Sequence, residues 1–374
     1  MGEREGKLAD LRVERLAQLL VRYSAPVAEG NKVEISGTML AAPLLRELYR
    51  ETLRAGGLPL LRMALPDQGA ILFKTASDAQ LTTVSPIDRM VTEEFDRRFV
   101  VLSDENTQEL SGVDPARQAL YQKARRPLQE TFMRRSGEGS LDWNICLYPT
   151  PAYAQDAGMS LSDYEDFAYG ACLLDHDDPV AAWQEVRQRQ QRLVDYLKDK
   201  HEVHLVGQDT DLRFSIAGRT FINDYGTKNM PGGEIFSGPV EDSVEGTIRY
   251  TYPAFYQGQA VEDVRLRFER GRVIEHSART NERFLSEMLD LDEGARTLGE
   301  CAFGTNNGIQ RFTRNVLFDE KMGGTMHFAL GAGYPDTGAL NQSALHWDMV
   351  TSLRGGSEVR VDGKLFVKDG EFVI

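Results

Sequence analysis

Apolar residues in the first half of the chain recur at the spacing of one helix face and also form short continuous runs. Leucines at helical intervals over residues 8–23 predict an amphipathic helix. A short run at 32–36 predicts a strand, the leucine-rich segment 41–53 a second helix, and residues 59–65 the next strand. Strand, helix and strand at this spacing form a βαβ unit, which predicts a parallel sheet covered by helices.

The pattern continues in the same style up to about residue 200. The charged segment 93–139 is predicted to be mostly helical, and residues 145–148 read as another buried strand. Asp178 and Pro179 are typical of a helix start, and the helix that follows is expected to run to Leu197. The first strand-to-helix turn has no glycine-rich phosphate loop, which disfavours nucleotide binding.

Beyond residue 200 the pattern changes to short alternating or apolar runs separated by Gly and Asp. Asp362-Gly363 and Asp369-Gly370 are typical of hairpin turns. The predicted fold is therefore an α/β N-terminal domain with a parallel sheet, residues 1–200, and a mainly β (α+β) C-terminal domain, residues 201–374. The strands expected in the second domain are residues 203–206, 212–216, 247–252, 264–268 and 359–361.

Composition and charge narrow the class of protein. A chain of 374 residues has room for two domains. Its 43 Lys and Arg against 57 Asp and Glu give a formal net charge of −14, which repels phosphate backbones. Nucleic acid is therefore not expected as a partner.

Cysteine usage and the chain start indicate a cytoplasmic protein. Three scattered cysteines, Cys146, Cys172 and Cys301, are too few for a disulfide framework or a thiolate metal site. The polar start, Met1 to Lys7, has no apolar core of the kind that a secretory signal needs. No run of about 18 apolar residues exists, so no membrane span is expected.

Two of the six histidines stand in unusual surroundings. His346 and Asp348 are two positions apart, so in a strand both side chains point to the same face. His327 lies in an apolar stretch, where a polar side chain needs a partner. The other histidines are expected to have surface or structural roles: His176, His201, His204 and His276.

Two isolated carboxylates upstream, Glu234 and Glu300, lie beside glycines, which allow backbone and ligand to approach closely. Two histidines and three carboxylates form a donor set that zinc, cobalt or manganese accepts. Taken singly, each feature has an ordinary alternative. Gly-Gly-Glu can be a turn with a solvated carboxylate, and His-x-Asp a core histidine with a fixed tautomer.

The chain resembles a known family, the aminopeptidase T / aminopeptidase S family of metalloaminopeptidases. The resemblance covers nearly the whole chain, beginning in residues 16–43, and its specific blocks lie in the second half. These blocks are 229–236 (NMPGGEIF), 292–295 (DEGA), 298–300 (LGE), 304–306 (GTN), 318–321 (FDEK), 323–327 (GGTMH), 333–335 (GYP), 341–343 (NQS) and 346–348 (HWD).

The resemblance implies a dinuclear metal centre in the second domain, which makes residues 201–374 the expected catalytic metal-binding domain. Two divalent ions (Zn, Co or Mn) are expected, with Glu300 bridging them. The implied metal ligands are Glu234, Glu300, His327, His346 and Asp348. Tyr334 matches a tyrosine at the family's metal centre, and Glu320 is expected to hydrogen-bond a ligand.

The expected function is release of N-terminal amino acids from peptides through a metal-activated water. Glu300 is expected to move the proton to the leaving amine, and Tyr334 to donate to the oxyanion. The family also implies a homodimer. Another dinuclear hydrolase, an amidohydrolase or a phosphoesterase, stays open, although the ligand blocks hold no Lys or Arg except Lys321. A non-enzymatic binding module with structural His and Glu residues is the third hypothesis.

Overall fold

A computed structural model describes residues 10–374, which form two compact units. The first unit comprises the chain up to Val180 together with Gly226–Met230, and the second comprises Ala181–Tyr225 and Pro231–Ile374. The predicted polar start, Met1 to Lys7, and Leu8 of the first predicted helix lie outside the described residues. The domain boundary near residue 200 stays a prediction.

The first unit is built on a five-stranded parallel sheet in the order β2-β1-β3-β4-β8. Its strands are β1 (Lys32–Thr38), β2 (Leu58–Ala64), β3 (Arg97–Leu102), β4 (Asp142–Leu147) and β8 (Asn229–Met230). The predicted βαβ unit is confirmed as β1, helix α2 (Ala42–Arg54) and β2. The helical prediction for 93–139 is wrong over β3, where Phe99 and Val101 are buried in the sheet and alternate with half-buried neighbours.

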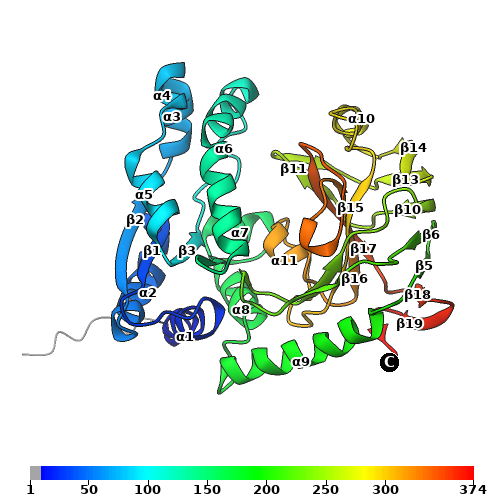
Figure 1. The fold of residues 1–374 in the computed structure, drawn as a ribbon, viewed down its shortest axis with the longest axis horizontal. Helices are drawn as coiled ribbons and strands as arrows, with labels where there is room; N and C mark the ends of the chain where they lie inside the picture. The colour runs from blue at the N-terminus through cyan, green and yellow to red at the C-terminus, as the bar shows by residue number, and fades with distance from the viewer. Residues whose placement is uncertain (1–9) are drawn as a thin grey trace, which may run out of the picture. The chain divides into compact units, whose positions relative to one another are not determined.

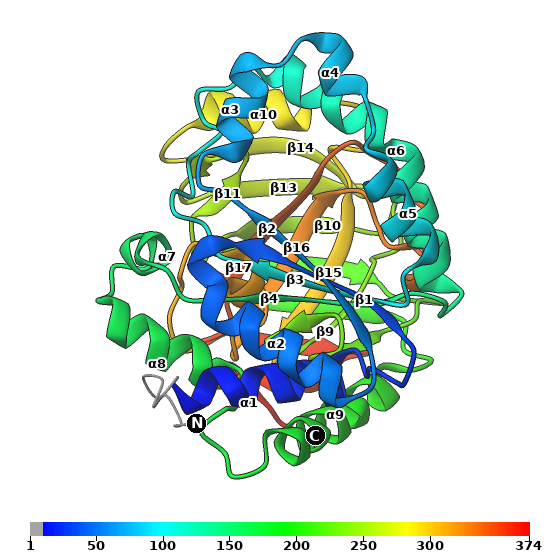
Figure 2. The same cartoon turned by 90° about the vertical axis from the view of Figure 1, so that its left-hand side faces the viewer.

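Helices cover both faces of this sheet, as Figures 1 and 2 show. The side chain of Leu45 on α2 approaches Gly37 on one face. Phe132 on α6 packs against Trp143 on the other face. The helices of this unit are α1 (Leu11–Leu19), α2, α3 (Gln68–Thr75), α4 (Asp78–Thr82), α5 (Pro86–Glu94), α6 (Pro115–Gly137), α7 (Pro151–Asp156) and α8 (Leu161–Ala171), with a π-helical turn at Leu20–Ser24 and a 3₁₀ turn at Met39–Ala41.

Three of these helices begin with the same local device. Ser85, Asp114 and Thr150 each accept a backbone N–H of the following first turn, and a proline comes next in each case. A capping oxygen satisfies an otherwise unpaired donor, and proline at the first helical position loses no hydrogen bond. No helix among residues 10–374 is long and apolar enough to cross a bilayer.

The second unit contains an eight-stranded sheet, a five-stranded sheet and a small β11-β12 hairpin. Helix α9 (Pro179–Leu197) leads into it, and it also holds α10 (Glu282–Leu289), α11 (Val316–Asp319) and a 3₁₀ turn at Pro335–Thr337. The eight-stranded sheet has the order β14 (Arg272–Ser277), β13 (Arg265–Glu269), β10 (Glu245–Arg249), β6 (Thr210–Ser215), β5 (Glu202–Gly207), β18 (Glu358–Val361), β19 (Lys364–Lys368) and β20 (Glu371–Phe372). The five-stranded sheet has the order β17 (His346–Ser352), β16 (Thr325–Gly331), β15 (Leu298–Gly304), β9 (Glu234–Ser237) and β7 (Ile222–Asp224); β11 is Ala254–Tyr256 and β12 Gln259–Val261.

The named strands of this unit pair antiparallel, with one isolated parallel bridge between Asn306 and Met322, so the predicted mainly β second half is confirmed. The two predicted hairpin turns join β18 to β19 and β19 to β20. Their Asp and Gly residues have positive φ values of 48° and 76° in the first turn, and 50° and 84° in the second. Such left-handed pairs match the twist of the flanking strands.

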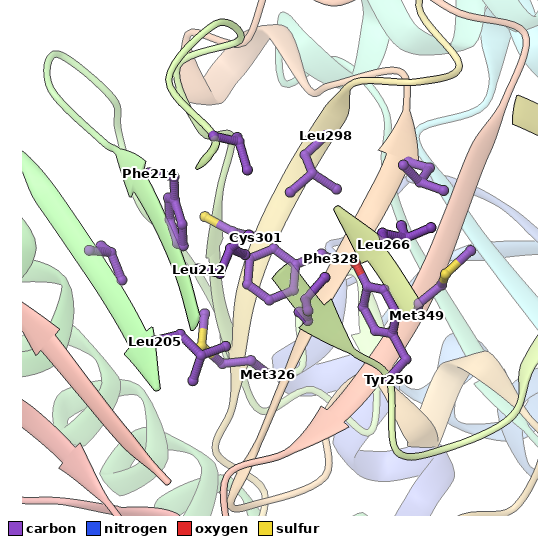
Figure 3. Close-up of a cluster of buried hydrophobic side chains, with 14 of the residues drawn as sticks. Leu205, Leu212, Phe214, Tyr250, Leu266, Leu298, Cys301, Met326, Phe328 and Met349 are labelled. Carbon is purple, nitrogen blue, oxygen red and sulfur yellow. The ribbon is translucent and has the colours of Figure 1, made fainter. Parts of the chain in front are cut away.

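The two large sheets enclose one hydrophobic core, shown in Figure 3. Leu212 and Phe214 of the eight-stranded sheet lie opposite Met326 and Phe328 of β16. The rings of Phe214 and Phe328 meet edge to face with centroids 5.7 Å apart. Each fully buried side chain of this size stabilises the fold by roughly 1.5–3 kcal/mol. One face of the five-stranded sheet is thereby committed to the core.

Candidate metal centre

Strand β16 runs through the middle of the centre and alternates strictly between two faces. Met326, Phe328 and Leu330 belong to the hydrophobic core. Because side chains alternate along a strand, His327, Ala329 and Gly331 lie on the opposite face. The small side chain of Ala329 leaves space there for groups from the neighbouring strands, while the backbone of Leu345 approaches Gly331 so closely that a Cβ would lie 2.2 Å from its oxygen.

The strands on either side fill that space with polar groups. Ala329 pairs with Glu300 on β15 and with Asp348 on β17, and Gly331 pairs with His346 on β17. His346 and Asp348 therefore lie on one face, as their spacing predicts, while Trp347 between them joins the core. Figure 1 shows β15, β16 and β17 adjacent to one another.

A one-residue irregularity in β15 turns Glu300 toward this face. Leu298 pairs with Leu330 and Glu300 with Ala329, so β15 advances two residues while β16 advances one. The extra residue is Gly299, and such a bulge re-aims the side chain that follows it. Leu298 consequently faces the core and Glu300 the polar face. A Cβ at Gly299 would lie 2.3 Å from the backbone oxygen of Ala332, so only glycine fits.

Glu234 reaches the same face from β9, where it pairs with Gly304 of β15. Gly233 before it has φ +118°, and a Cβ there would lie 2.5 Å from the Cβ of Asn306. Gln190 of α9 donates a 2.7 Å hydrogen bond from Nε2 to the backbone oxygen of Glu234. Sequence reasoning did not single out Gln190, because a glutamine in an amphipathic helix carries no sign of a distant partner.

Two groups of side chains meet around Glu300. In the inner group (Glu234, Glu300 and His327), His327 Nε2 lies 3.5 Å from Glu234 Oε2 and 3.5 Å from Glu300 Oε1. In the outer group (Glu300, His346 and Asp348), His346 Nε2 lies 3.4 Å from Glu300 Oε2 and 3.5 Å from Asp348 Oδ2. Each oxygen of Glu300 thus belongs to a different group. The five residues singled out in the sequence are brought together.

Hydrogen bonds to the backbone orient both imidazole rings. The Nδ1 of His327 lies 3.1 Å from the carbonyl oxygen of Glu320, and that of His346 lies 2.8 Å from the carbonyl oxygen of Ala332. A carbonyl oxygen only accepts, so each Nδ1 carries a proton and donates it. The neutral ring then presents the lone pair of Nε2 to the carboxylates, which is the arrangement of a metal-ligating histidine.

Lone pairs that face each other across 3.4–3.5 Å repel unless a cation lies between them. Glu234 Oε2 and Asp348 Oδ1 are buried and have no hydrogen-bond partner. Buried charges are stable only when they are paired or coordinate a metal. The donor set, its burial and these two orphaned oxygens all fit divalent cations.

The buried carboxylates and imidazoles of the centre shift one another's pKa values. Burial opposes the charge on both rings, but the carboxylates raise the pKa of His327 to about 9 and that of His346 to about 10. Burial also opposes the charge on Glu300, yet hydrogen bonds from both histidines lower its pKa to about 2. Burial, reinforced by Glu320, raises the pKa of Asp348 to about 8.

Lys321 and Glu320 complete the inner side of the centre. Lys321 is buried, with Nζ 2.7 Å from Glu320 Oε2 and 3.3 Å from Glu234 Oε1. Glu320 was expected to hydrogen-bond a ligand; its backbone oxygen does so with His327, while its carboxylate pairs with Lys321. The sequence signal for Lys321 is only its place in the 318–321 block.

Tyr334 lies at the rim of the outer group. Its ring meets that of His346 edge to face, with centroids 5.2 Å apart, and that of Phe236 at 5.5 Å. The residue is 42% exposed. Burial of part of the ring, together with Glu300 and Asp348, raises the pKa of its hydroxyl, which therefore stays a neutral donor.

Two of the other histidines make ordinary local contacts. His204 Nε2 lies 2.7 Å from Asp211 Oδ1, and His276 Nε2 lies 2.7 Å from the hydroxyl of Ser286. His176 and His201 are exposed. None of these four belongs to a candidate metal cluster among residues 10–374.

A sequence profile described as thermophilic metalloprotease (M29) matches residues 9–372, nearly the whole chain. The chain belongs to this family. The M29 assignment confirms the resemblance found in the sequence blocks, and a metalloprotease requires a metal, for which the cluster around Glu300 is the candidate site.

Similar proteins agree with the M29 assignment in sequence and fold. Aminopeptidase 2 of Geobacillus stearothermophilus is 27% identical, over 96% of this chain and 95% of that one. Aminopeptidase T of Thermus thermophilus is 27% identical over 94% of both chains. The solved structure of wild-type AmpT from Thermus thermophilus superposes with a TM-score of 0.83 at 25% identity, covering 97% of this chain and 99% of that chain. A 2,5-dihydroxypyridine dioxygenase from Pseudomonas putida shares the fold, with a TM-score of 0.60 at 13% identity.

Proposed function

We propose that this M29 member is an aminopeptidase with two divalent ions, Zn, Co or Mn, one in the inner group and one in the outer group. Glu234, Glu300, His327, His346 and Asp348 are the residues that would hold these ions, and Glu300 would be shared between the two groups. The single observation that carries this proposal is that the two carboxylate oxygens of Glu300 face different groups, Oε1 the inner group and Oε2 the outer group. Relatives named aminopeptidases support the peptide substrate.

Bound divalent ions supply water of near-neutral pKa and polarise a carbonyl group. Glu300 lies between the two groups and is the proposed carrier of the proton from the attacking water to the leaving amine. Tyr334, a neutral donor at the rim beside His346, is proposed to donate its O–H to the oxyanion of the tetrahedral intermediate.

The fixed cation at the centre is not available to a phosphate. Lys321 is buried, and its ammonium group is paired with Glu234 and Glu320. Phosphoesters are usually held by free Lys or Arg groups beside the metals. This pairing favours an aminopeptidase over a phosphoesterase.

The decisive experiment combines metal analysis with a substrate panel. We expect about two divalent ions per chain by mass spectrometry, and hydrolysis of aminoacyl-anilides that stops after exhaustive chelation and returns with added Zn, Co or Mn. N-acetylated substrates should resist cleavage. Cleavage of acetylated substrates or of phosphoesters at comparable rates would instead indicate an amidohydrolase or a phosphoesterase, and full activity without metal would exclude all three.

A pair of histidine variants separates the centre from the rest of the unit. His346→Gln removes a proposed ligand and should lose at least one ion and most of kcat. His276→Gln removes only a contact to Ser286 and should keep both ions and near-normal turnover. Retention of both ions by His346→Gln would contradict the ligand assignment.

The family resemblance also leads us to propose a homodimer that works in the cytoplasm. Cys146, Cys172 and Cys301 are buried and form no disulfide, which suits a reducing compartment. Light scattering on the purified protein tests the dimer, and a monomer at micromolar concentration would refute it. Fractionation of cells that express the protein tests the compartment.

A further inference from the structure

The two groups of the candidate centre differ by one fixed positive charge. Lys321 pairs with Glu234 in the inner group and with Glu320 beside it. Its Nζ lies 3.3 Å from Glu234 Oε1 and 2.7 Å from Glu320 Oε2, and these two carboxylates stabilise the buried side chain as an ammonium ion. Within residues 10–374, His346 and Asp348 of the outer group have no Lys or Arg as an ion-pair partner.

The two groups also differ in access. Glu234, Glu300 and His327 are all buried. In the outer group the side chain of His346 is 30% exposed and that of Asp348 13% exposed. A cation that arrives from solvent therefore meets the outer group first, and it meets no ammonium ion there.

We propose that Lys321 makes the inner group the weaker of the two metal sites, so that the centre fills in order, first the outer group and then the inner group. The inference rests on the proposed dinuclear centre. A divalent ion beside Glu234 would be repelled by the ammonium ion that contacts the same carboxylate, and this repulsion is strong because Glu234 and Lys321 are buried. An ion held by His346 and Asp348 would not share a carboxylate with Lys321.

Lys321 has a second effect of opposite sign, because it positions Glu234. Its ammonium group holds Oε1, which leaves Oε2 facing His327. The backbone of Glu234 is held independently, by strand pairing to Gly304 and by the hydrogen bond from Gln190. Because the backbone is fixed, loss of the ammonium group changes the charge of the site more than its geometry. We therefore expect the metal affinity of the inner group to rise when that charge is removed.

Calorimetric titration of the metal-free full chain with Mn²⁺ tests this order. The wild type should bind in two distinct steps. Lys321→Met, which keeps the volume and removes the charge, should tighten the weaker step by about tenfold or more and leave the stronger step unchanged. Lys321→Arg keeps the charge and should keep the steps apart. Lys368→Met is the control. This exposed lysine lies 3.9 Å from Glu358 in the eight-stranded sheet, whereas the proposed ligands lie in the five-stranded sheet.

Ligand variants identify the steps. Glu234→Gln should abolish the weaker step, and Asp348→Asn the stronger one. Lys321→Gln, a second neutral side chain of similar length, should narrow the gap in the same way and gives a second test if Lys321→Met does not fold. Equal steps in the wild type, no shift in Lys321→Met, or a weaker second step in that variant would each overturn the order.

Failure of this inference is distinguishable from failure of the proposed function. Two equal Mn²⁺ steps together with aminopeptidase activity would overturn the order and leave the function intact. Two unequal steps that shift as described, in a protein that cleaves no peptide, would support the order and refute the function.

Discussion

Single residues of the centre place carboxylate oxygens in the protein interior without hydrogen-bond partners, which is unfavourable. Buried carboxylates without partners, such as Glu234 at Oε2 and Asp348 at Oδ1, destabilise a fold unless a cation neutralises them. Each imidazole is turned by a backbone carbonyl so that Nε2 faces carboxylate oxygens. This arrangement of side chains favours a bound cation and lowers the stability of the metal-free protein.

The raised pKa values of the histidines predict proton release on metal binding. His327, with a pKa of about 9, and His346, with a pKa of about 10, both hold a second proton at pH 7 in the metal-free protein, and the carboxyl of Asp348, with a pKa of about 8, holds one as well. Metal ligation requires neutral rings and an ionised carboxylate, so binding at pH 7 should release these protons. Apparent affinity should rise with pH up to about the higher of these pKa values and then level off.

Calorimetry of metal binding in buffers of different ionisation enthalpy measures this release directly. The observed heat should change with the buffer at pH 7 and lose that dependence only well above pH 10, because His346 has a pKa of about 10. The variant His204→Gln, which alters a histidine paired with Asp211, should release as many protons as the wild type. Heat that is independent of the buffer at pH 7 would show that the rings are already neutral.

At the scale of elements, helices and strands were predicted correctly where buried and exposed residues alternate regularly along the sequence. The βαβ unit and the alternating strands β5, β6 and β13 are readable because each buries a regular set of positions. Strand β3 was missed because Arg97 and Arg98 open it within a charged segment. The bulge in β15 could not be predicted. A glycine such as Gly299 indicates that another group approaches the backbone closely, but the sequence does not say which segment that group belongs to.

That bulge yields a prediction about glycine. In Gly299→Ala the new methyl group would lie 2.3 Å from the backbone oxygen of Ala332, and a backbone atom cannot swing aside. The strand must shift, which should cost about 1–3 kcal/mol of unfolding free energy and displace Glu300 from both groups.

Thermal or denaturant unfolding and metal titration check both parts. Gly170→Ala is the matched control, because a Cβ there meets nothing within 4 Å, and alanine favours the helix α8. It should keep stability and metal content. A Gly299→Ala protein with wild-type stability and normal metal affinity would show that β15 tolerates the change, and the role given to the bulge would be wrong.

At the scale of the whole molecule, the candidate centre belongs to one compact unit. Glu234 and Asp348 are more than a hundred positions apart in the sequence, and both lie in the second unit, on strands β9 and β17 of one five-stranded sheet with β15 and β16 between them. Residue spacing alone could join only His346 to Asp348. The remaining members of the donor set were proposed from the resemblance to a family, because strand order is a long-range property that local patterns do not encode.

This location predicts that bound metal stabilises the two units unequally. Ligands that bind only the folded state stabilise it, by about 2.7 kcal/mol at a hundredfold excess over Kd. All proposed ligands lie on β9, β15, β16 and β17, so added Zn, Co or Mn should slow amide hydrogen exchange in those strands. Strands β1–β4 of the first unit hold no proposed ligand and should exchange at unchanged rates. Hydrogen exchange followed by mass spectrometry, with and without metal, resolves these peptides. Equal protection of both sheets would mean that the units unfold as one cooperative body, and protection of β1–β4 alone would place the metal outside the cluster around Glu300.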